Sequence, residues 1–529
     1  MAHYINLGNE AFASARADEY IDKTGLIAFI NGTLFTESRF SCISRCRRFG
    51  KSMAAKMLCA YYDKSCDSRE LFRGLEIENH PDFEKHLNKY SVIYIDMTNY
   101  ISDHGHDNDI VARLQREVKD DVIKAYPDVT LTDNTRLMDV LIDIALATGD
   151  RFVVIIDEWD AICREFSPSE KAMDEYVRLL RRMFKSIDAM GVFAAVYMTG
   201  ILPMKRYETQ SALNNFWEYS MIQPGPLASF FGFTREEVKV LCDKHGMAFE
   251  DMVKWYDGYN IGRQASMFNP SSVMKALKLQ EYGNFWAATG AFDAVARYIK
   301  MDFDGLRKSI VQMLGGIPCK VDTSSFSNDP HIIRDRDEVL TLLIHLGYLA
   351  YNYYEHECYI PNMEVAEEMK NAVKLNGWRE VMNAIRASEE LLDSILDADE
   401  DAVANGIQQV HEDSVSVLKY NNENSLSCVM NLALFSARAK YRIVRELPTG
   451  KGFADLVLIP WRNVNLPAIV IELKWKHDAQ TAITQIRERN YPASLASYSG
   501  ELILCGVSYD TQTKKHQCRI ERLSTGSAA

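Results

Sequence analysis

The sequence lacks most features that would set it apart from ordinary soluble globular proteins. It has no run of about eighteen apolar residues, so we expect no membrane-spanning helix. Its first residues, MAHYINLGNEAF, contain no basic segment followed by an apolar one, which argues against export. The 11 cysteines include no CxxC pair and no zinc-like spacing with histidine. This pattern fits reduced thiols in the cytoplasm better than a disulfide framework.

An excess of positive charge is also absent, since the formal net charge is −13 at pH 7. This charge argues against a protein that coats nucleic acid non-specifically, but it leaves room for a local basic groove. Hydrophobic residues make up 47% of the chain and charged residues 25%, which is typical of globular proteins. Because 529 residues are too many for one hydrophobic core, we expect three domains, at residues 1–230, 231–412 and 413–520.

The N-terminal part alternates short apolar runs with potentially helical segments, which is typical of a parallel α/β sheet. Parallel central strands are covered on both faces and therefore appear as continuous apolar runs. The predicted strands lie at residues 40–44, 92–96, 152–157 and 192–199.

The segment FSCISRCRRFGKSMAAKMLCAYYD predicts a strand, a loop and a helix, with Gly50-Lys51-Ser52 at the start of the helix. This is the context of a P-loop. Gly50 would allow a phosphate to approach the helix N-terminus, Lys51 would reach the β- and γ-phosphates, and the Ser52 hydroxyl would bind Mg²⁺. The alternative is a glycine that serves ordinary turn chemistry between strand and helix.

The P-loop match is imperfect, because Arg45 stands where the pattern asks for its first glycine. Together with Arg47 and Arg48 it gives the loop three cations. These could contact phosphates, pair with acidic residues or face nucleic acid, and we assign Arg48 to the nucleotide site.

The apolar run RFVVIIDEWD ends in Asp157 and Glu158 and has the form of a Walker B strand. Asp157 would hold the Mg²⁺ ion, and Glu158 could polarise the attacking water. The alternative is an acidic strand end that caps the following helix. Thr199 closes another predicted strand and is placed like a sensor residue, although a threonine there is often only a strand residue.

The middle of the chain, from about residue 234 to 412, has the pattern of amphipathic helices broken by loops. The predicted helices include residues 235–244, 271–279, 292–298 and 338–346. The aromatic segment WYDGY at residues 255–259 is expected to build a domain interface. The alternative is a lid that stacks a base.

The C-terminal part has the order helix, three strands, helix, strand. The helices are predicted at residues 425–439 and 479–489, and the strands at 441–446, 454–459, 468–474 and 501–507. Glu472 and Lys474 project from one face, because side chains alternate along a strand. Asp455 begins the previous strand, and a hairpin between the two strands could place it beside Glu472.

Two carboxylates in that position would hold Mg²⁺ or Mn²⁺ through their oxygens. The metal would lower the pKa of a bound water and neutralise charge on a scissile phosphate. Lys474 could orient the water or stabilise the developing negative charge. The alternative is a Glu-x-Lys pair on a solvated strand face.

This arrangement resembles the PD-(D/E)XK nuclease superfamily. The resemblance implies that Asp455 and Glu472 ligate the metal, that Lys474 assists the water and that Gln485 supports the site. It also implies a helix-borne acidic residue, for which Glu423 is the candidate metal ligand. Glu446 competes with Glu423 for that role, and either one could be a surface carboxylate.

The chain as a whole resembles a bacterial AAA-ATPase-like family whose members carry a C-terminal PD-(D/E)XK nuclease domain. Family members usually show Arg-Pro-Arg-Arg before FGKS, and Cys46 replaces that proline here, which should loosen the loop. The implied fold class is α/β, with a P-loop NTPase-like parallel sheet, a helical middle domain and a nuclease-like α/β domain. The matching segments are YIDKTGLI, RCRRFGKSM, VVIIDEWD, YMTGI, WYDGYNIG, FNPSSV, LTLLIHLGYLAY, NNENSL, ELPTGKGFADLVLIP and IELKW.

The leading hypothesis is a cytoplasmic protein whose ATP-bound state controls Mg²⁺-dependent cleavage of nucleic acid, with DNA the expected substrate. A homo-oligomer is compatible with this hypothesis. A second hypothesis is a nucleotide-switched signalling or scaffold protein with a vestigial nuclease fold, and a third is a DNA-binding ATPase that cuts nothing.

Overall fold

The computed structural model of the chain describes most of its length. The described residues are 3–105, 109–132, 135–166, 171–204, 213–286, 300, 303, 305–326, 333–375, 378–414, 429–430, 433–449, 452–461, 464–475, 478–488 and 500–523. Within these ranges no helix has the length and apolar character that crossing a membrane requires. The cysteines described there are all free thiols.

The chain folds into two compact units, each of which combines segments that are separate in the sequence. Unit 1 consists of Met1–Leu241, Gly258–Lys275 and Asp322–His356, and unit 2 of Cys242–Asp257, Ala276–Val321 and Glu357–Ala529. The three domains expected from the sequence, with boundaries at residues 230 and 412, stay a prediction.

Unit 1 contains a parallel five-stranded sheet with the strand order β2-β3-β4-β1-β5. The strands are β1 Phe40–Ser44, β2 Ser91–Asp96, β3 Phe152–Asp157, β4 Phe193–Gly200 and β5 Trp217–Tyr219. Every residue of β1, β3 and β4 is buried, which explains their continuous apolar sequences. The four predicted strands are confirmed to within one residue at each end. The short edge strand β5, whose Trp217 and Glu218 are exposed, was not predicted.

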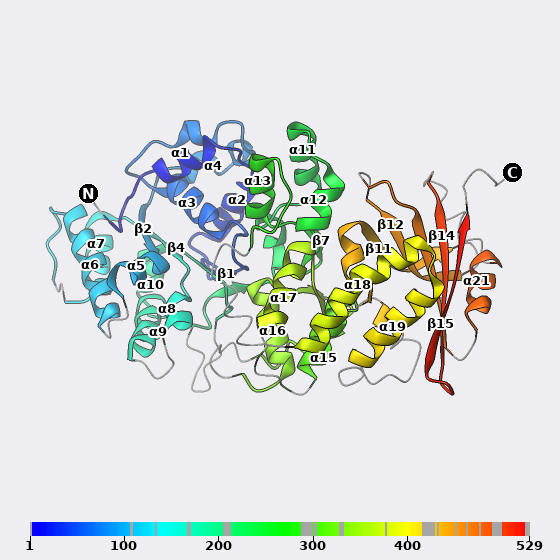
Figure 1. Ribbon diagram of the computed structural model, residues 1–529. Helices are drawn as coiled ribbons and strands as arrows, with labels where there is room; N and C mark the ends of the chain where they lie inside the picture. The colour runs from blue at the N-terminus through cyan, green and yellow to red at the C-terminus, as the bar shows by residue number, and fades with distance from the viewer. Residues whose placement is uncertain are drawn as a thin grey trace. The chain divides into compact units, whose positions relative to one another are not determined.

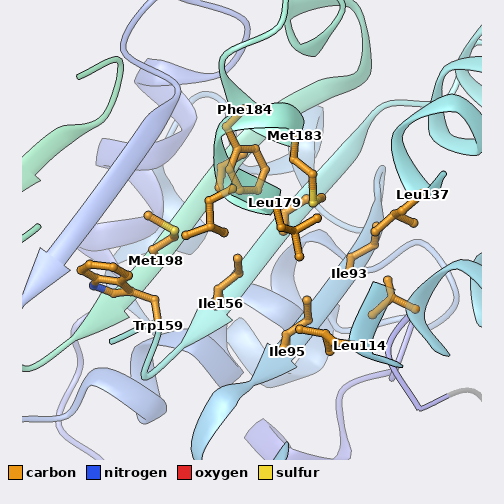
Figure 2. Close-up of a cluster of buried hydrophobic side chains, with 14 of the residues drawn as sticks. Ile93, Ile95, Leu114, Leu137, Ile156, Trp159, Leu179, Met183, Phe184 and Met198 are labelled. Carbon is orange, nitrogen blue, oxygen red and sulfur yellow. The ribbon is translucent and has the colours of Figure 1, made fainter. Parts of the chain in front are cut away.

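Helices cover both faces of this sheet, and alternate residues of one strand enter two different cores. Phe152, Val154 and Ile156 of β3 join one cluster, whereas Val153 and Ile155 join the other. Figure 2 shows the first cluster, in which side chains of β2, β3 and β4 meet those of α6, α7 and α9. The helices are α1 Glu10–Arg16, α2 Gly25–Thr33, α3 Lys51–Tyr62, α4 Phe83–His86, α5 Met97–His104, α6 Ile110–Ala125, α7 Leu137–Thr148, α8 Ala161–Glu165, α9 Lys171–Phe184 and α10 Ala189–Val192, with 3₁₀ turns η1 Arg69–Phe72, η2 Glu76–Asn79 and η3 Gly225–Phe230.

The middle of the chain is mainly helical, as expected (Figure 1). The predicted helices at 235–244, 271–279 and 338–346 are confirmed, while residues 292–298 lie outside the described part. Local signals explain α16: Asp335 accepts a hydrogen bond from the Glu338 amide at its start, and Gly347 ends it in the left-handed region. The elements are α11 Arg235–His245, α12 Phe249–Tyr256, β6 Tyr259–Ile261, β7 Gln264–Met267, α13 Pro270–Leu279, α15 Leu306–Leu314, β8 Cys319–Lys320, α16 Arg336–Leu346, β9 Ala350–Asn352, β10 Glu357–Tyr359, α17 Met363–Leu375, α18 Arg379–Asp397 and α19 Glu400–Ser414.

Unit 2 contains a mixed five-stranded sheet with the order β11-β12-β13-β14-β15. Only β13 and β14 pair in parallel, and helix α21 connects them because parallel neighbours need a crossover. The edge strand β15, which carries several charged residues, was not predicted. Six residues of the predicted helix 425–439 lie outside the described part, at 425–428 and 431–432. Of the others, residues 429, 430 and 433 are helical, and the last four form the 3₁₀ turn η5. The elements are η5 Ser436–Ala439, β11 Tyr441–Thr449, β12 Gly452–Pro460, β13 Ala468–Trp475, α21 Ala479–Glu488, β14 Leu502–Asp510 and β15 Lys515–Leu523.

Candidate functional site

The loop between β1 and α3 has the geometry of a phosphate-binding turn. Helix α3 begins at Lys51, and Gly50 precedes it with φ +90°, in the left-handed region that glycine adopts most readily. A Cβ at Gly50 would meet no atom within 4 Å, so the backbone angle and not crowding requires glycine. The first amides of α3 have no partner within the helix, which makes this end a site for an anion.

Lys51 is held inside this loop. Its Nζ donates hydrogen bonds to the carbonyl oxygens of Arg45 at 3.0 Å and Cys46 at 3.2 Å. The same ammonium group lies 3.3 Å from Oε1 of Glu158. Lys51 therefore brings the loop and the end of β3 together, and its charge is balanced by Glu158 before any phosphate is present.

Asp157 ends β3 with one carboxylate oxygen engaged and the other open. Thr199, at the end of the neighbouring strand β4, donates a hydrogen bond to Oδ1, and the Glu158 amide donates to the same oxygen at 3.1 Å. Oδ2 is buried and has no hydrogen-bond partner among the described residues. Burial raises the pKa of Asp157, although the nearby hydroxyls of Ser52 and Thr199 oppose this shift.

This donor set fits a magnesium ion at the nucleotide site. The Ser52 hydroxyl and the unpaired Asp157 oxygen are both hard oxygen donors, which Mg²⁺ prefers together with the oxygens of substrate phosphates. The structure thus brings together Gly50, Lys51, Ser52, Asp157 and Thr199, which were selected from distant segments of the sequence. Their roles stay predictions.

Glu158 follows Asp157 in a strained conformation, with φ +51°. Its Oε1 lies 3.3 Å from Lys51, and its Oε2 lies 2.6 Å from Nη2 of Arg164. Burial raises the pKa of Glu158, but Lys51 and Arg164 outweigh that effect, and the net pKa is lowered. Glu158 is therefore an anion with both oxygens engaged, and its role toward water stays a prediction.

A cavity of about 390 Å³ opens beside the loop, entirely within unit 1. Arg47, Arg48 and Lys51 are among the residues that line it, and the assignment of Arg48 to a nucleotide stays a prediction. Apolar side chains make up much of the rest of the lining, as is common in small-molecule pockets. We did not predict from the sequence which apolar residues line the cavity, although two of them, Tyr20 and Ile21, begin the matching segment YIDKTGLI. The apolar lining residues include Tyr20, Ile21, Met57, Phe230, Phe233 and Met274.

Arg45 has none of the three roles that the sequence left open for the loop arginines. Its side chain is completely buried. Nη1 donates to the carbonyl oxygens of Ser44 at 2.9 Å and Tyr219 at 2.8 Å, and the guanidinium stacks 5.2 Å from the centre of the Phe231 ring. Arg45 therefore joins β1 to β5, away from any phosphate, and only Arg47 and Arg48 line the cavity.

The tyrosines of the middle segment are packed and offer no open ring face. Tyr256 and Tyr259 are completely buried. The Tyr256 hydroxyl donates to the Gly283 carbonyl at 3.0 Å, and the Tyr259 hydroxyl donates to the Gly347 carbonyl at 2.9 Å. Such rings cannot stack a base without unpacking, which favours packing over a lid.

In unit 2, two acidic residues occupy one rung of the sheet. The register of β12 and β13 sets Leu456 opposite Ile471, so the next rung sets Asp455 opposite Glu472. Oδ2 of Asp455 accepts a hydrogen bond from the Leu473 amide at 2.7 Å. Glu472 is only 1% exposed, a degree of burial that a solvated strand face would not produce.

Lys474 and Gln485 both reach the Glu472 carboxylate. Nζ of Lys474 lies 3.1 Å from Oε1 of Glu472, and Nε2 of Gln485 donates to the same oxygen. Helix α21 can bring Gln485 this close because Gly506 lies opposite Glu472 and has no side chain. A Cβ at Gly506 would lie 2.5 Å from the Ala479 carbonyl oxygen, within the first turn of α21.

The carboxylate pair fits a hard divalent cation. No group of three or more His, Cys, Asp and Glu side chains suited to a metal occurs within the described ranges. Mg²⁺ is commonly held by one or two carboxylates, with substrate and water oxygens completing its shell. Asp455 and Glu472 meet that requirement, and Lys474 adds a cation beside them.

The choice between Glu423 and Glu446 stays open. Glu423 lies outside the described residues. Residue 446 lies in β11 between the pairs Arg445–Leu456 and Leu447–Ala454, which gives its backbone the register position of Asp455. Nothing is described of the Glu446 side chain.

Comparisons with known protein families match two separate stretches of the chain. Residues 6–209 match a family described as predicted AAA-ATPase, and residues 421–518 match the PD-(D/E)XK nuclease superfamily. No curated protein matches.

Similarity to solved structures is low. One is Cdc6p from Pyrobaculum aerophilum, with 11% identity, 66% of this chain and 93% of that chain covered, and a TM-score of 0.25. A second is ORC2 of Aeropyrum pernix with ADPNP and ADP, with 14% identity, coverage of 70% and 99%, and a TM-score of 0.30. A third is Aeropyrum pernix ORC1 in complex with DNA, with 10% identity, coverage of 70% and 96%, and a TM-score of 0.25.

The family matches show that the chain carries an AAA-ATPase-like domain at residues 6–209 and a PD-(D/E)XK nuclease superfamily domain at residues 421–518.

Proposed function

We propose that the chain binds ATP in the cavity of unit 1 and hydrolyses phosphodiester bonds of nucleic acid at the carboxylate pair of unit 2. The nucleotide state of unit 1 controls cleavage. The observation that carries the nuclease part is the convergence of Asp455, Glu472, Lys474 and Gln485 at one point of the sheet, from β12, β13 and α21.

At the nucleotide site, the α3 amides and Lys51 bind the phosphates, and the apolar side chains that line the cavity contact the nucleoside. Ser52 and Asp157 hold Mg²⁺, which neutralises phosphate charge when bound. Thr199 fixes the Asp157 carboxylate through its hydrogen bond. Glu158 orients the attacking water once Lys51 has moved to the phosphates.

At the nuclease site, Asp455 and Glu472 would hold Mg²⁺ or Mn²⁺, which when bound would supply an activated water and neutralise charge on the scissile phosphate. Lys474 leaves Glu472 to stabilise the negative charge that develops on the phosphate. Gln485 keeps the Glu472 carboxylate oriented through its hydrogen bond. We propose DNA as the substrate. We also propose the cytoplasm as the compartment, because the described cysteines are free thiols.

The deciding experiment is cleavage of single- and double-stranded oligonucleotides, DNA and RNA, by the full chain with Mg²⁺ or Mn²⁺, with and without ATP. The Glu472→Gln variant should lose cleavage by on the order of a hundredfold or more. Glu488→Gln is the matched control, because Glu488 is exposed on α21 close to Gln485. Wild-type protein that cuts none of these substrates, with or without ATP, would refute the nuclease assignment.

A second function is favoured by one observation. Lys474 and Gln485 both bind the same oxygen of Glu472, an arrangement that would also suit a carboxylate kept only for structure. The chain would then be a nucleotide-switched scaffold with a vestigial nuclease fold. Mn²⁺ binding separates the two functions: an active site loses Mn²⁺ when Asp455 is changed to Asn, whereas a vestigial site binds none.

A further inference from the structure

Arg164 links two carboxylates at the end of β3. It lies on α8, and its side chain is only 14% exposed. Nη2 is 2.6 Å from Oε2 of Glu158, and Nε is 3.1 Å from Oδ2 of Asp160. Nη2 donates a hydrogen bond to Glu158, whereas Nε has no hydrogen-bond partner among the described residues, so Arg164 is held to Asp160 by charge.

Asp160 anchors this arginine to the end of β4. Its carboxylate is buried and accepts hydrogen bonds from the amides of Ile201, at 3.3 and 3.2 Å, and Leu202, at 2.9 Å. The Asp160 carboxylate packs closely against Gly200 at the end of β4, since a Cβ at Gly200 would lie 2.7 Å from Oδ1 of Asp160. The position of Arg164 is therefore set by the backbone that follows β4.

The backbone of Glu158 is equally constrained. The amide of Trp159 donates to the Thr199 carbonyl at 2.8 Å. The Trp159 ring packs in the buried cluster with Met198 and Ile156 (Figure 2). Since the main chain cannot move freely, the orientation of the Glu158 carboxylate depends on its two cationic partners, Arg164 and Lys51.

These contacts form one chain of interactions from β4 to the phosphate loop. We propose that Arg164 is a positioning residue that shares Glu158 with Lys51, and thereby sets how readily Lys51 is released to a nucleotide phosphate. This inference rests on the proposed binding of ATP. Without Arg164, the negative charge of Glu158 falls on Lys51 alone, which holds Lys51 back from phosphate. After Lys51 has left, Glu158 then has no cation to orient it toward water.

The test compares Arg164→Gln and Arg164→Lys with wild-type full chain, using ATP and ADP as probes. Binding is measured calorimetrically and hydrolysis in single-turnover assays. We expect Arg164→Gln to raise the nucleotide Kd roughly threefold to tenfold, in the lower part of the range of coupling between contacting residues, and to slow hydrolysis as well. Arg164→Lys should recover part of both, because a lysine keeps the charge but lacks the planar fork.

The Glu158→Gln background separates positioning from a merely structural role. If Arg164 acts through Glu158, then adding Arg164→Gln to Glu158→Gln should not weaken nucleotide binding further. An equal loss in both backgrounds would overturn the inference. Arg69→Gln is the matched control, since Arg69 pairs with Glu84 at an exposed position and should leave binding unchanged.

Three further outcomes are decisive. If wild-type protein binds nucleotide and the Arg164→Gln and Arg164→Lys variants bind it equally well, the inference is overturned but the proposed function is not. Wild-type protein that binds no nucleotide overturns both the proposed function and the inference. If Arg164→Gln fails to fold because Asp160 is left buried and unpaired, Arg164→Lys with and without Glu158→Gln gives the same comparison, and additive losses count against the inference.

Discussion

The two candidate sites of this chain are both proposed to bind phosphate groups, but they are built differently. In unit 1 the anion site is made largely by the backbone at the start of α3, with Lys51 the buried cation beside it. In unit 2 the site consists of side chains, Asp455 and Glu472, aligned by the pairing of neighbouring strands. The first site needs a particular backbone conformation, and the second needs a particular strand register.

This difference explains which sequence changes each site tolerates. A glycine of the P-loop pattern is replaced by Arg45, and the loop keeps its shape because the Arg45 side chain turns into the core. A comparable tolerance is not expected in unit 2. A slip of one residue between β12 and β13 would move Glu472 to the other face of the sheet and separate it from Gln485.

The largest expected effect tests whether the two sites bind their ligands independently. Lys51→Met removes the cation while it keeps most of the buried side-chain volume. Nucleotide affinity should fall by on the order of a hundredfold, as expected for a buried charge contact. Mn²⁺ binding that depends on Asp455 should stay at the wild-type value, and both are measured by calorimetry. A parallel loss of that Mn²⁺ binding would show that the sites are not separate.

Gly506→Ala should break the site of unit 2 by crowding. The new Cβ would lie 2.5 Å from the Ala479 carbonyl oxygen and 2.9 Å from Cβ of Ala482. Helix α21 must then move, which we expect to cost about 1–3 kcal/mol in the free energy of unfolding and to detach Gln485 from Glu472. Denaturant unfolding measures the cost. The control is Gly283→Ala in the same unit, where a Cβ meets nothing within 4 Å.

Gly50→Ala should damage the site of unit 1 by backbone strain instead. Space is available around Gly50, but φ is +90°, a conformation that costs an L-residue about 1–2 kcal/mol. We expect a loss of stability of that size, with weakened ATP binding as α3 shifts its first turn. Gly50→Asn should be milder, because asparagine tolerates the left-handed region better. Equal effects of alanine and asparagine would contradict a conformational cause.

Sequence patterns predicted the strands that are buried on both faces of the sheet, because such burial gives a continuous apolar run in the sequence. Strands β1 and β3 were predicted with their observed bounds because both faces are buried, so every residue is apolar or small except Asp157, which ends β3. Strands β5 and β15 were missed because edge strands expose one side and carry polar residues. The rung of Asp455 and Glu472 could be anticipated, since a hairpin and alternation along a strand are local rules.

Contacts between distant segments could not be predicted in the same way. An arginine in a loop has the pattern of an exposed residue, and nothing local indicates that Arg45 packs under Phe231. The pairing of Lys51 with Glu158 joins residues far apart in the chain, and the lining of the cavity combines Tyr20, Phe230 and Met274. Such sites arise from topology, which a single sequence does not display.

A further expected effect concerns acid stability and sharpens the comparison between the units. Burial, with His411 beside the ring, lowers the pKa of His516 in unit 2 to about 3. Burial lowers the pKa of His345 in unit 1 to about 3 as well. Both rings are therefore neutral when folded, whereas in the unfolded chain histidine has a pKa of about 6.5.

Between pH 6.5 and pH 3 the unfolded chain binds the extra proton, so stability should fall as the pH drops below about 6.5, by up to about 1.4 kcal/mol per pH unit for each ring. Above pH 6.5 neither ring contributes to the pH dependence. His516→Gln should flatten this dependence in unit 2 only, because glutamine does not titrate. Hydrogen exchange of β14 and β15 amides from pH 7 to pH 5 measures the effect, with His345→Gln as the control. If His516→Gln left the slope for β14 and β15 unchanged, another group would be responsible for the acid sensitivity of unit 2.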